Sequence, residues 1–166
     1  MSAALYDECV PVMSRFLTNL KAILAKGAAH AAANKVDEAV FTTARLYPDM
    51  FAFARQVQIA CDNAKGAAAR LGGVDIPRHA DTEVSFADLT ARIDKTLDFI
   101  NGIDRAAFAQ RGDAPVVLAF GDWRREFTPS EYLRTWALPN FYFHVTTAYD
   151  ILRHNGVAVG KMDYLA

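Results

Sequence analysis

The stretch YPDMFAFARQVQIACDNAKGAAARLGG, residues 47–73, decides the fold of this chain. Its apolar residues return every three or four positions, which places them on one face of an α-helix. The glycine pair at residues 72–73 is a typical stop signal for such a helix. We therefore predict an amphipathic helix from about Pro48 to Leu71. Its buried face consists of Met50, Phe53, Val57, Cys61, Ala64, Ala68 and Leu71.

Two further segments, residues 5–27 and 85–100, carry the same periodicity. In the first, Pro11 interrupts the pattern, so the helix is either kinked there or begins there. In the second, Ser85 is a typical helix cap, and Asp88 three residues later can complete a capping box. Both segments are predicted to be amphipathic helices.

The fourth predicted helix extends from Thr128 to Gly156. It opens with Thr-Pro-Ser-Glu, a capping box with proline at the first helical position. Pro139 is expected to bend it. Just before it, residues 116–127 read VVLAFGDWRREF, and β-branched and aromatic residues around Gly121-Asp122 predict a tight β-hairpin.

These segments together predict an all-α fold, a four-helix bundle with a small β-hairpin between its third and fourth helices. Residues 28–47 form a long crossover between the first and second helices, with Ala-rich and short helical pieces. The chain contains no internal repeat and no low-complexity linker, so we expect one domain over residues 1–166.

Composition narrows the classes of function. Eighteen basic and nineteen acidic residues give a net charge of -1, and no Lys/Arg cluster provides the field that nucleic-acid binding needs. Two cysteines are too few for a disulfide scaffold and favour a reducing compartment. The first residues carry acids where a signal peptide is basic, and no apolar run is long enough to span a bilayer. We expect a soluble cytoplasmic protein that binds neither nucleic acid nor membrane.

Asn140 and His144 are polar residues within the apolar arc of the fourth helix, with Thr147 beside them. An unpaired buried polar group costs about 1–3 kcal/mol, so each needs a protein partner or a ligand. Side chains at i and i+4 can also share one metal ion, although only His144 is a good ligand for a first-row metal. The pair is therefore either the floor of a pocket or a set of core residues with protein partners.

The second helix carries polar residues beside its apolar stripe. Gln58 and Asp62 could reach across the groove to His144, where Asp62 would fix the imidazole tautomer. Alternatively, Asp62 pairs with Lys65 or Arg55 at a solvated edge of the bundle.

Residues 47–73 and 138–157, together with residues 5–20, resemble the DinB/YfiT-like superfamily, and most closely one of its uncharacterised branches. The resemblance spans essentially the whole chain and implies a four-helix bundle. Metal-binding members of that superfamily use three histidines, one in the second helix and an HxxxH pair in the fourth. Some members are thiol-dependent transferases or isomerases acting with low-molecular-weight thiols.

The resemblance places the HxxxH pair on Asn140 and His144, and the second-helix histidine on Gln58, or with a shift on Cys61 or Asp62. The chain thus keeps one of the three histidines. Neutral amides are weak ligands, so we expect no tight transition-metal site. At most, a weakly bound divalent metal is held by His144, with Gln58 and Asn140 as weak ligands.

Two functions follow as hypotheses. The first is a divergent small-molecule or thiol-dependent enzyme with a degenerate metal site at the bundle core. The second is a non-catalytic binding or dimerising bundle whose buried polar network fixes the helices. The aromatic residues Tyr142, Phe143 and Tyr149 also predict a homodimer. The enzyme hypothesis takes His144 as the catalytic residue and assigns substrate binding to Gln58, Asp62, Asn140 and Thr147.

Overall fold

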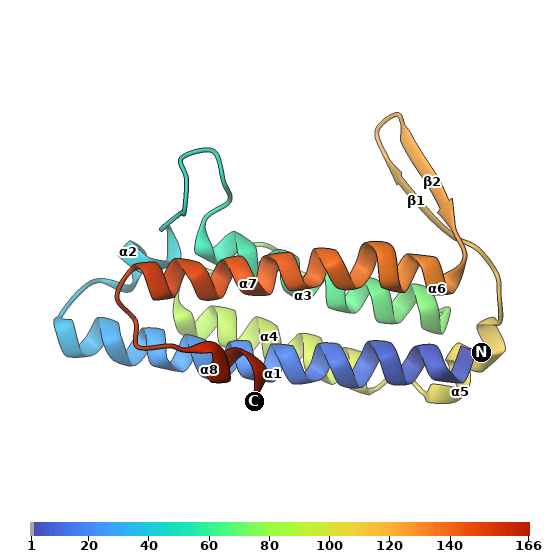
Figure 1. Cartoon of the computed structure of the whole chain (residues 1–166), viewed down its shortest axis with the longest axis horizontal. Helices are drawn as coiled ribbons and strands as arrows, with labels where there is room; N and C mark the ends of the chain where they lie inside the picture. Colours follow the sequence, from blue (N-terminus) through green and yellow to red (C-terminus); the bar gives the residue numbers. More distant parts are fainter. Residues whose placement is uncertain (1) are drawn as a thin grey trace.

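Four long helices lie side by side in the computed structural model, which describes residues 2–166 and the side chains from residue 4 onward (Figure 1). They pack lengthwise around a shared core, as the sequence predicts, and this confirms the four-helix bundle. The helices are α1 (Ser2–Asn34), α3 (Phe53–Gly72), α4 (Phe86–Asn101) and α7 (Leu138–His154).

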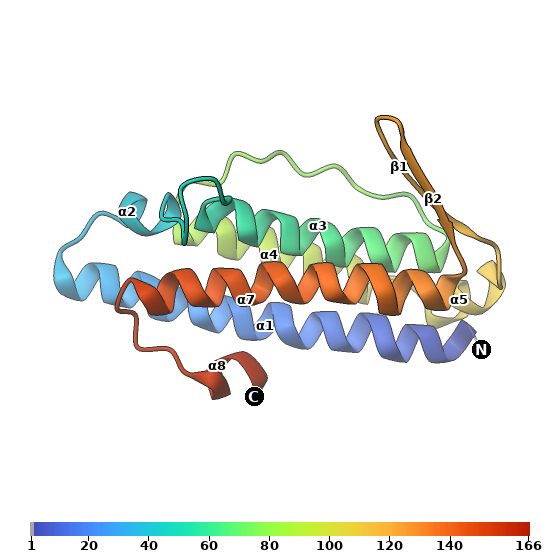
Figure 2. The same cartoon turned by 45° about the horizontal axis from the view of Figure 1, so that its top comes forward.

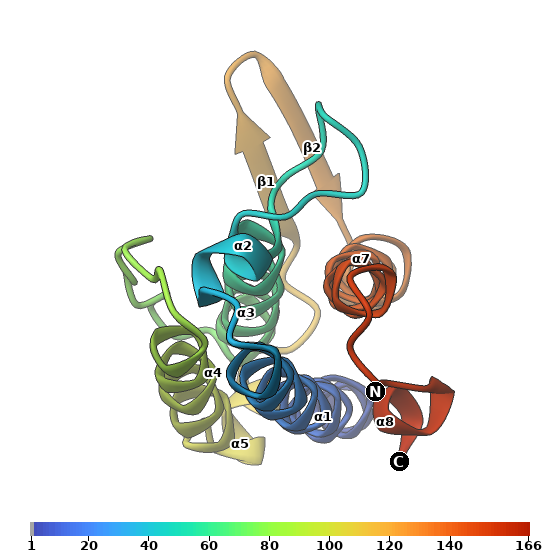
Figure 3. The ribbon, with the colours of Figure 1, turned by 90° about the vertical axis from the view of Figure 1, so that its left-hand side faces the viewer.

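Helix α3 packs against both α4 and α7, and α1 closes the bundle on its other side (Figure 3). Each helix turns its apolar face inward, and Met13, Phe53, Leu89 and Phe141 are fully buried there. Burial of each such side chain stabilises the fold by about 1.5–3 kcal/mol. None of the helices within residues 2–166 is long and apolar enough to cross a membrane.

The predicted hairpin is confirmed. Strand β1 (Val116–Phe120) pairs antiparallel with β2 (Trp123–Phe127), and Phe120 lies opposite Trp123. Gly121 and Asp122 therefore form a two-residue turn, and Gly121 has the positive φ of 56° that such a turn requires. The hairpin projects from one end of the bundle (Figure 1). The remaining short helices are α2 (Glu38–Thr42), α5 (Arg105–Arg111) and α8 (Lys161–Leu165).

Helix boundaries differ from the predicted ones at two places. Helix α1 contains Pro11 and continues to Asn34, because the Ala-rich residues 28–33 are strong helix formers. Helix α3 begins at Phe53 rather than near Pro48, and Ala52 is its cap residue.

The fourth long helix is irregular at its start. Thr128 and Glu131 form the predicted capping box, and α6 (Pro129–Glu131) leads into a π-helix, η1 (Tyr132–Ala137), before α7 begins. Pro139 has no N–H to donate to the preceding turn. The expected irregularity around Pro139 thus takes the form of wider π turns that precede it.

Two long connections join the main helices, one at an end of the bundle and one along its side. Residues 35–52 lead from α1 to α3 and contain α2, as expected for the long crossover. Residues 73–85, by contrast, run back along the bundle from the end of α3 to the start of α4 (Figure 2). Helices α3 and α4 therefore point in the same direction, and the return segment needs its own attachments to the bundle.

Candidate functional site

His144 lies in the contact between α7 and α3, with only 8% of its surface exposed. Its Nδ1 is 2.6 Å from Oε1 of Gln56. An amide oxygen only accepts hydrogen bonds, so Nδ1 carries the proton and Nε2 is the unprotonated nitrogen. The Gln56 amide is itself oriented, because its Nε2 donates to the carbonyl of Phe51 at 3.1 Å. The chain from Phe51 through Gln56 to His144 thus selects one imidazole tautomer.

Burial, and then repulsion from Arg55, together lower the pKa of His144 to about 4. The imidazole is therefore neutral near pH 7. Within residues 4–166, no protein group hydrogen bonds to its Nε2, and the sealed unpaired polar atoms are His79 Nδ1 and Arg92 Nε. The His144 Nε2 lone pair consequently keeps a contact with solvent.

The expectation that Gln58 faces His144 is wrong. Residues two apart on an α-helix point about 200° apart, so Gln56 and Gln58 face opposite sides of α3. The Gln58 amide donates to Glu83 at 2.9 Å, and its oxygen accepts from Arg55 at 3.2 Å.

A sequence signal for Gln56 exists. It starts a second row of buried positions at helical spacing, and that row continues with Ala60 and Ala67, which are both fully buried. Small residues in such a row let α7 approach α3 closely. The row was hidden beside the stronger apolar stripe of the same helix.

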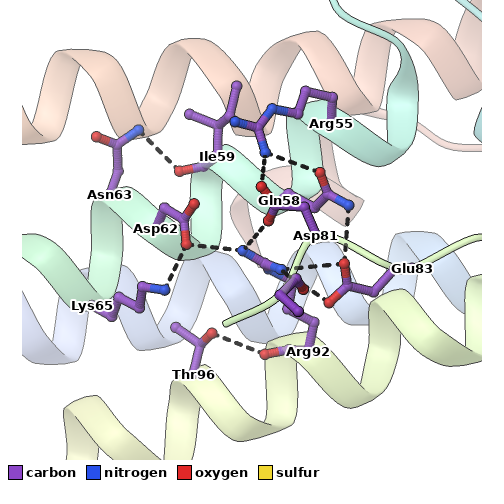
Figure 4. A network of polar contacts seen from close by, with 11 residues as sticks. Arg55, Gln58, Ile59, Asp62, Asn63, Lys65, Asp81, Glu83, Arg92 and Thr96 are labelled. Atoms are coloured by element: carbon purple, nitrogen blue, oxygen red, sulfur yellow. Dashed lines mark hydrogen bonds and ion pairs between the residues drawn. The ribbon is translucent and has the colours of Figure 1, made fainter. Parts of the chain in front are cut away.

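On the opposite side of α3, a charged network surrounds Arg92 of α4, whose side chain is 1% exposed (Figure 4). Its Nη1 lies 3.0 Å from Glu83 and 3.0 Å from the carbonyl of Ala80. Its Nη2 lies 2.9 Å from Asp62 and 3.0 Å from Asp81. The guanidinium thereby attaches the return segment, residues 73–85, to both α3 and α4.

Asp62 belongs to this network and not to His144. It also accepts from Lys65 at 2.8 Å, so the alternative pairing with Lys65 is the one found. Arg55 pairs with Asp81 on the return segment. The expectation that Asp62 fixes the tautomer of His144 is therefore wrong, because Gln56 takes that position.

The remaining predicted site residues lie near His144 on α7. Asn140 is half-buried one turn earlier, and Thr147 is buried. The Thr147 hydroxyl donates to the carbonyl of Phe143 in its own helix at 2.7 Å. On α3, Cys61 is fully buried, and burial raises the pKa of its thiol to about 12, so it is not a reactive nucleophile.

The aromatic residues predicted to form a dimer face are only partly exposed. Tyr142 packs edge-on against Phe16, with ring centroids 5.0 Å apart, and Tyr149 packs against Tyr164 at 6.2 Å. Phe143 alone of the three is well exposed, at 56%. Helices α1 and α8 thus cover two of the three aromatic residues, and the homodimer stays a prediction.

The donor set around His144 does not fit a three-histidine metal centre. Within the described part of the chain, no group of three or more His, Cys, Asp or Glu residues is placed to hold a metal ion. Nε2 is the ring nitrogen of His144 that keeps a lone pair, and the residues at the positions of the two other histidines are the neutral amides Gln58 and Asn140. Amide oxygens are weak ligands for zinc or nickel.

Cavities lie near several of these groups. One, of about 470 Å³, lies at the start of α1 beside the bonded pair Glu8 and Arg134. A second, about 290 Å³, lies between residues 73–85 and α4, beside Arg92. The third, about 140 Å³, lies between α7 and α8. His144 lines none of these three cavities.

Four long helices, with a hairpin before the last of them, form the bundle in which His144 lies near the middle of that last helix. The family model of DUF1993, a domain of unknown function, matches residues 5–165, and the chain belongs to this family. It is similar to a DinB family member protein from Shewanella denitrificans with a known crystal structure, at 45% identity and a TM-score of 0.91. That match covers 99% of this chain and 93% of the other, and confirms the resemblance. No curated protein matches the chain.

Proposed function

We propose that this chain is a metal-independent binding bundle. Hydrogen bonds and ion pairs between side chains hold its helices together where metal-binding relatives carry a metal centre. One observation carries the proposal: within residues 4–166 no group of three His, Cys, Asp or Glu side chains is placed to hold a metal ion, and His144 is instead bonded through Nδ1 to Gln56 at 2.6 Å. This contact ties α7 to α3 and occupies the amide oxygen that would otherwise be free for a ligand. Loss of such a buried contact costs about 1–3 kcal/mol, enough to give it a role in fixing the helices.

Metal analysis tests this proposal. The purified chain is incubated with zinc or nickel, desalted, and analysed for bound metal next to the variant His144→Gln. We expect less than stoichiometric metal in both proteins, because one imidazole and neutral amides bind weakly. Stoichiometric metal in the native chain that disappears in His144→Gln would overturn the proposal.

A divergent small-molecule or thiol-dependent enzyme is the second candidate. It is favoured by the fixed tautomer of His144 and by the solvent contact of its Nε2, which make that lone pair a proton acceptor. With a pKa of about 4, the imidazole is a weak base near pH 7. The test is consumption of a low-molecular-weight thiol by an added electrophile. Activity that persists in a folded His144→Gln variant would exclude this role.

Two further expectations belong to the proposal. Cys9 and Cys61 are buried and unpaired, which supports a reducing compartment and hence a cytoplasmic location. The exposed ring of Phe143 supports a homodimer through α7. Sedimentation over a wide concentration range tests the dimer, and a constant monomer mass that is unchanged in Phe143→Ser would exclude it.

A further inference from the structure

Two residues that each carry a sealed, unpaired polar atom line the same cavity. Within residues 4–166, the buried side-chain nitrogen or oxygen atoms without a hydrogen-bond partner are His79 Nδ1 and Arg92 Nε. Both residues line the cavity of about 290 Å³ between the return segment and α4, together with Thr82 and Lys95. Unpaired buried polar atoms are rare in folded proteins, so their occurrence together at one cavity indicates a missing partner.

The acidic side chains in the cavity wall are already engaged. Glu83 accepts from Arg92 and from Gln58 (Figure 4). Asp88 accepts from the backbone N–H of Ser85 in the cap of α4, and this bond lowers its pKa. Neither carboxylate is therefore available as a partner for the sealed nitrogen atoms.

The positive groups at the cavity are not fully used. Lys95 is exposed and forms no ion pair with any residue in the described part of the chain. The pKa of His79 is lowered, first by burial and then by the positive charges of Lys65, Lys95 and Arg92, which outweigh the opposite effect of Asp62. Lys65 and Arg92 are paired with carboxylates, so Lys95 is the one of these three cations that remains to attract an anion to the cavity.

We propose that this cavity binds a small molecule through an anionic oxygen group, either a carboxylate or a phosphate. The site rests on the binding function proposed above and gives that function a ligand class. Lys95 supplies the charge, and the His79 ring donates a hydrogen bond to a ligand oxygen atom. His79 Nδ1 is sealed in the free protein, so a rotation of the half-buried ring accompanies binding. The volume of about 290 Å³ restricts the ligand to the smallest class of ligands that proteins enclose.

The test is a titration of the ¹⁵N-labelled full chain with sodium phosphate, and separately with sodium succinate, at constant ionic strength with sodium chloride as the reference. We expect saturable shifts confined to residues 76–95 and the His79 ring. The probe that binds more tightly identifies the oxygen group. Lys95→Met, which keeps the apolar stem, is expected to weaken binding about tenfold. Lys161→Met, which removes an exposed charge on α8, is the matched control and should leave binding unchanged.

Several results would overturn the site. These are shifts that do not saturate, shifts centred elsewhere, or equal weakening by Lys95→Met and Lys161→Met. Such a failure is separate from a failure of the proposed binding bundle. The metal analysis tests His144, which lies between α3 and α7, whereas the anion titration tests the cavity beside α4. A chain without metal and without anion binding would keep the first proposal and lose this one.

Discussion

The two sides of helix α3 accommodate buried polar side chains in different ways. Toward α7, the buried polar pair is Gln56 and His144, and burial, followed by repulsion from Arg55, lowers the pKa of the imidazole so that it is neutral near pH 7. Toward α4, Arg92 carries a permanent charge, and Glu83, Asp62 and Asp81 offset the cost of burying it. A buried histidine can avoid this cost by losing its proton, whereas a buried arginine needs carboxylate partners.

The largest effect is expected from the charged side. Arg92→Met should lower the free energy of unfolding by about 3–5 kcal/mol, because the Glu83 carboxylate, only 12% exposed, then keeps the neutral Gln58 amide but loses its positive partner. Urea denaturation measures the loss. Arg105→Met is the control, since Arg105 pairs with Asp7 on the surface and should change stability by about 1 kcal/mol or less. Similar losses in the two variants would show that burial of Arg92 does not matter.

The contact between Gln56 and His144 should make the stability of the chain depend on pH. The pKa of His144 is about 4 in the folded chain and has an ordinary value of 6.5 when unfolded. Between these values the unfolded chain binds the proton and the folded chain does not. Stability is therefore full above pH 6.5 and falls as the pH drops toward 4, by at most about 3 kcal/mol. Unfolding free energies of the native chain and His144→Gln across this range measure the difference, and parallel curves would contradict it.

Two glutamines on opposite faces of α3 offer a matched comparison. Gln56→Leu should cost about 1–3 kcal/mol, because His144 Nδ1 and the carbonyl of Phe51 lose their partner. It should also mix the two tautomers of His144, which long-range ¹H–¹⁵N spectra of the imidazole report. Gln58→Leu should leave the tautomer unchanged, because Gln58 bonds to Glu83. A tautomer change in Gln58→Leu alone would reverse the assignment.

The smallest effect on stability is expected from an exposed ion pair. Lys21 and Asp94 join α1 to α4 at 2.6 Å, with side chains 42% and 46% exposed. Lys21→Met should change stability by about 0–1 kcal/mol, because water screens the pair. Thermal denaturation at low and high salt measures this. A loss as large as that of Arg92→Met would mean that exposure does not separate the two kinds of ion pair.

The local elements were predictable because their signals lie within a few residues. The cap at Ser85, the capping box at Thr128 and the turn at Gly121-Asp122 each depend on neighbours in the chain, and all three are found. The inward position of His144 also followed from helical periodicity. The identity of its partner did not follow, because choosing between Gln56 and Gln58 requires knowing how α3 is rotated about its own axis.

The sequence by itself determined that four amphipathic helices form and that His144 points inward. Only the tertiary structure decided that Gln56 meets His144 and that Arg92 gathers the carboxylates of three segments. One residue along a helix turns a side chain by about 100°, so an error of two positions moves it to the opposite face. The path of residues 73–85 follows no local periodicity, and the charged network exists only because that segment returns along the bundle.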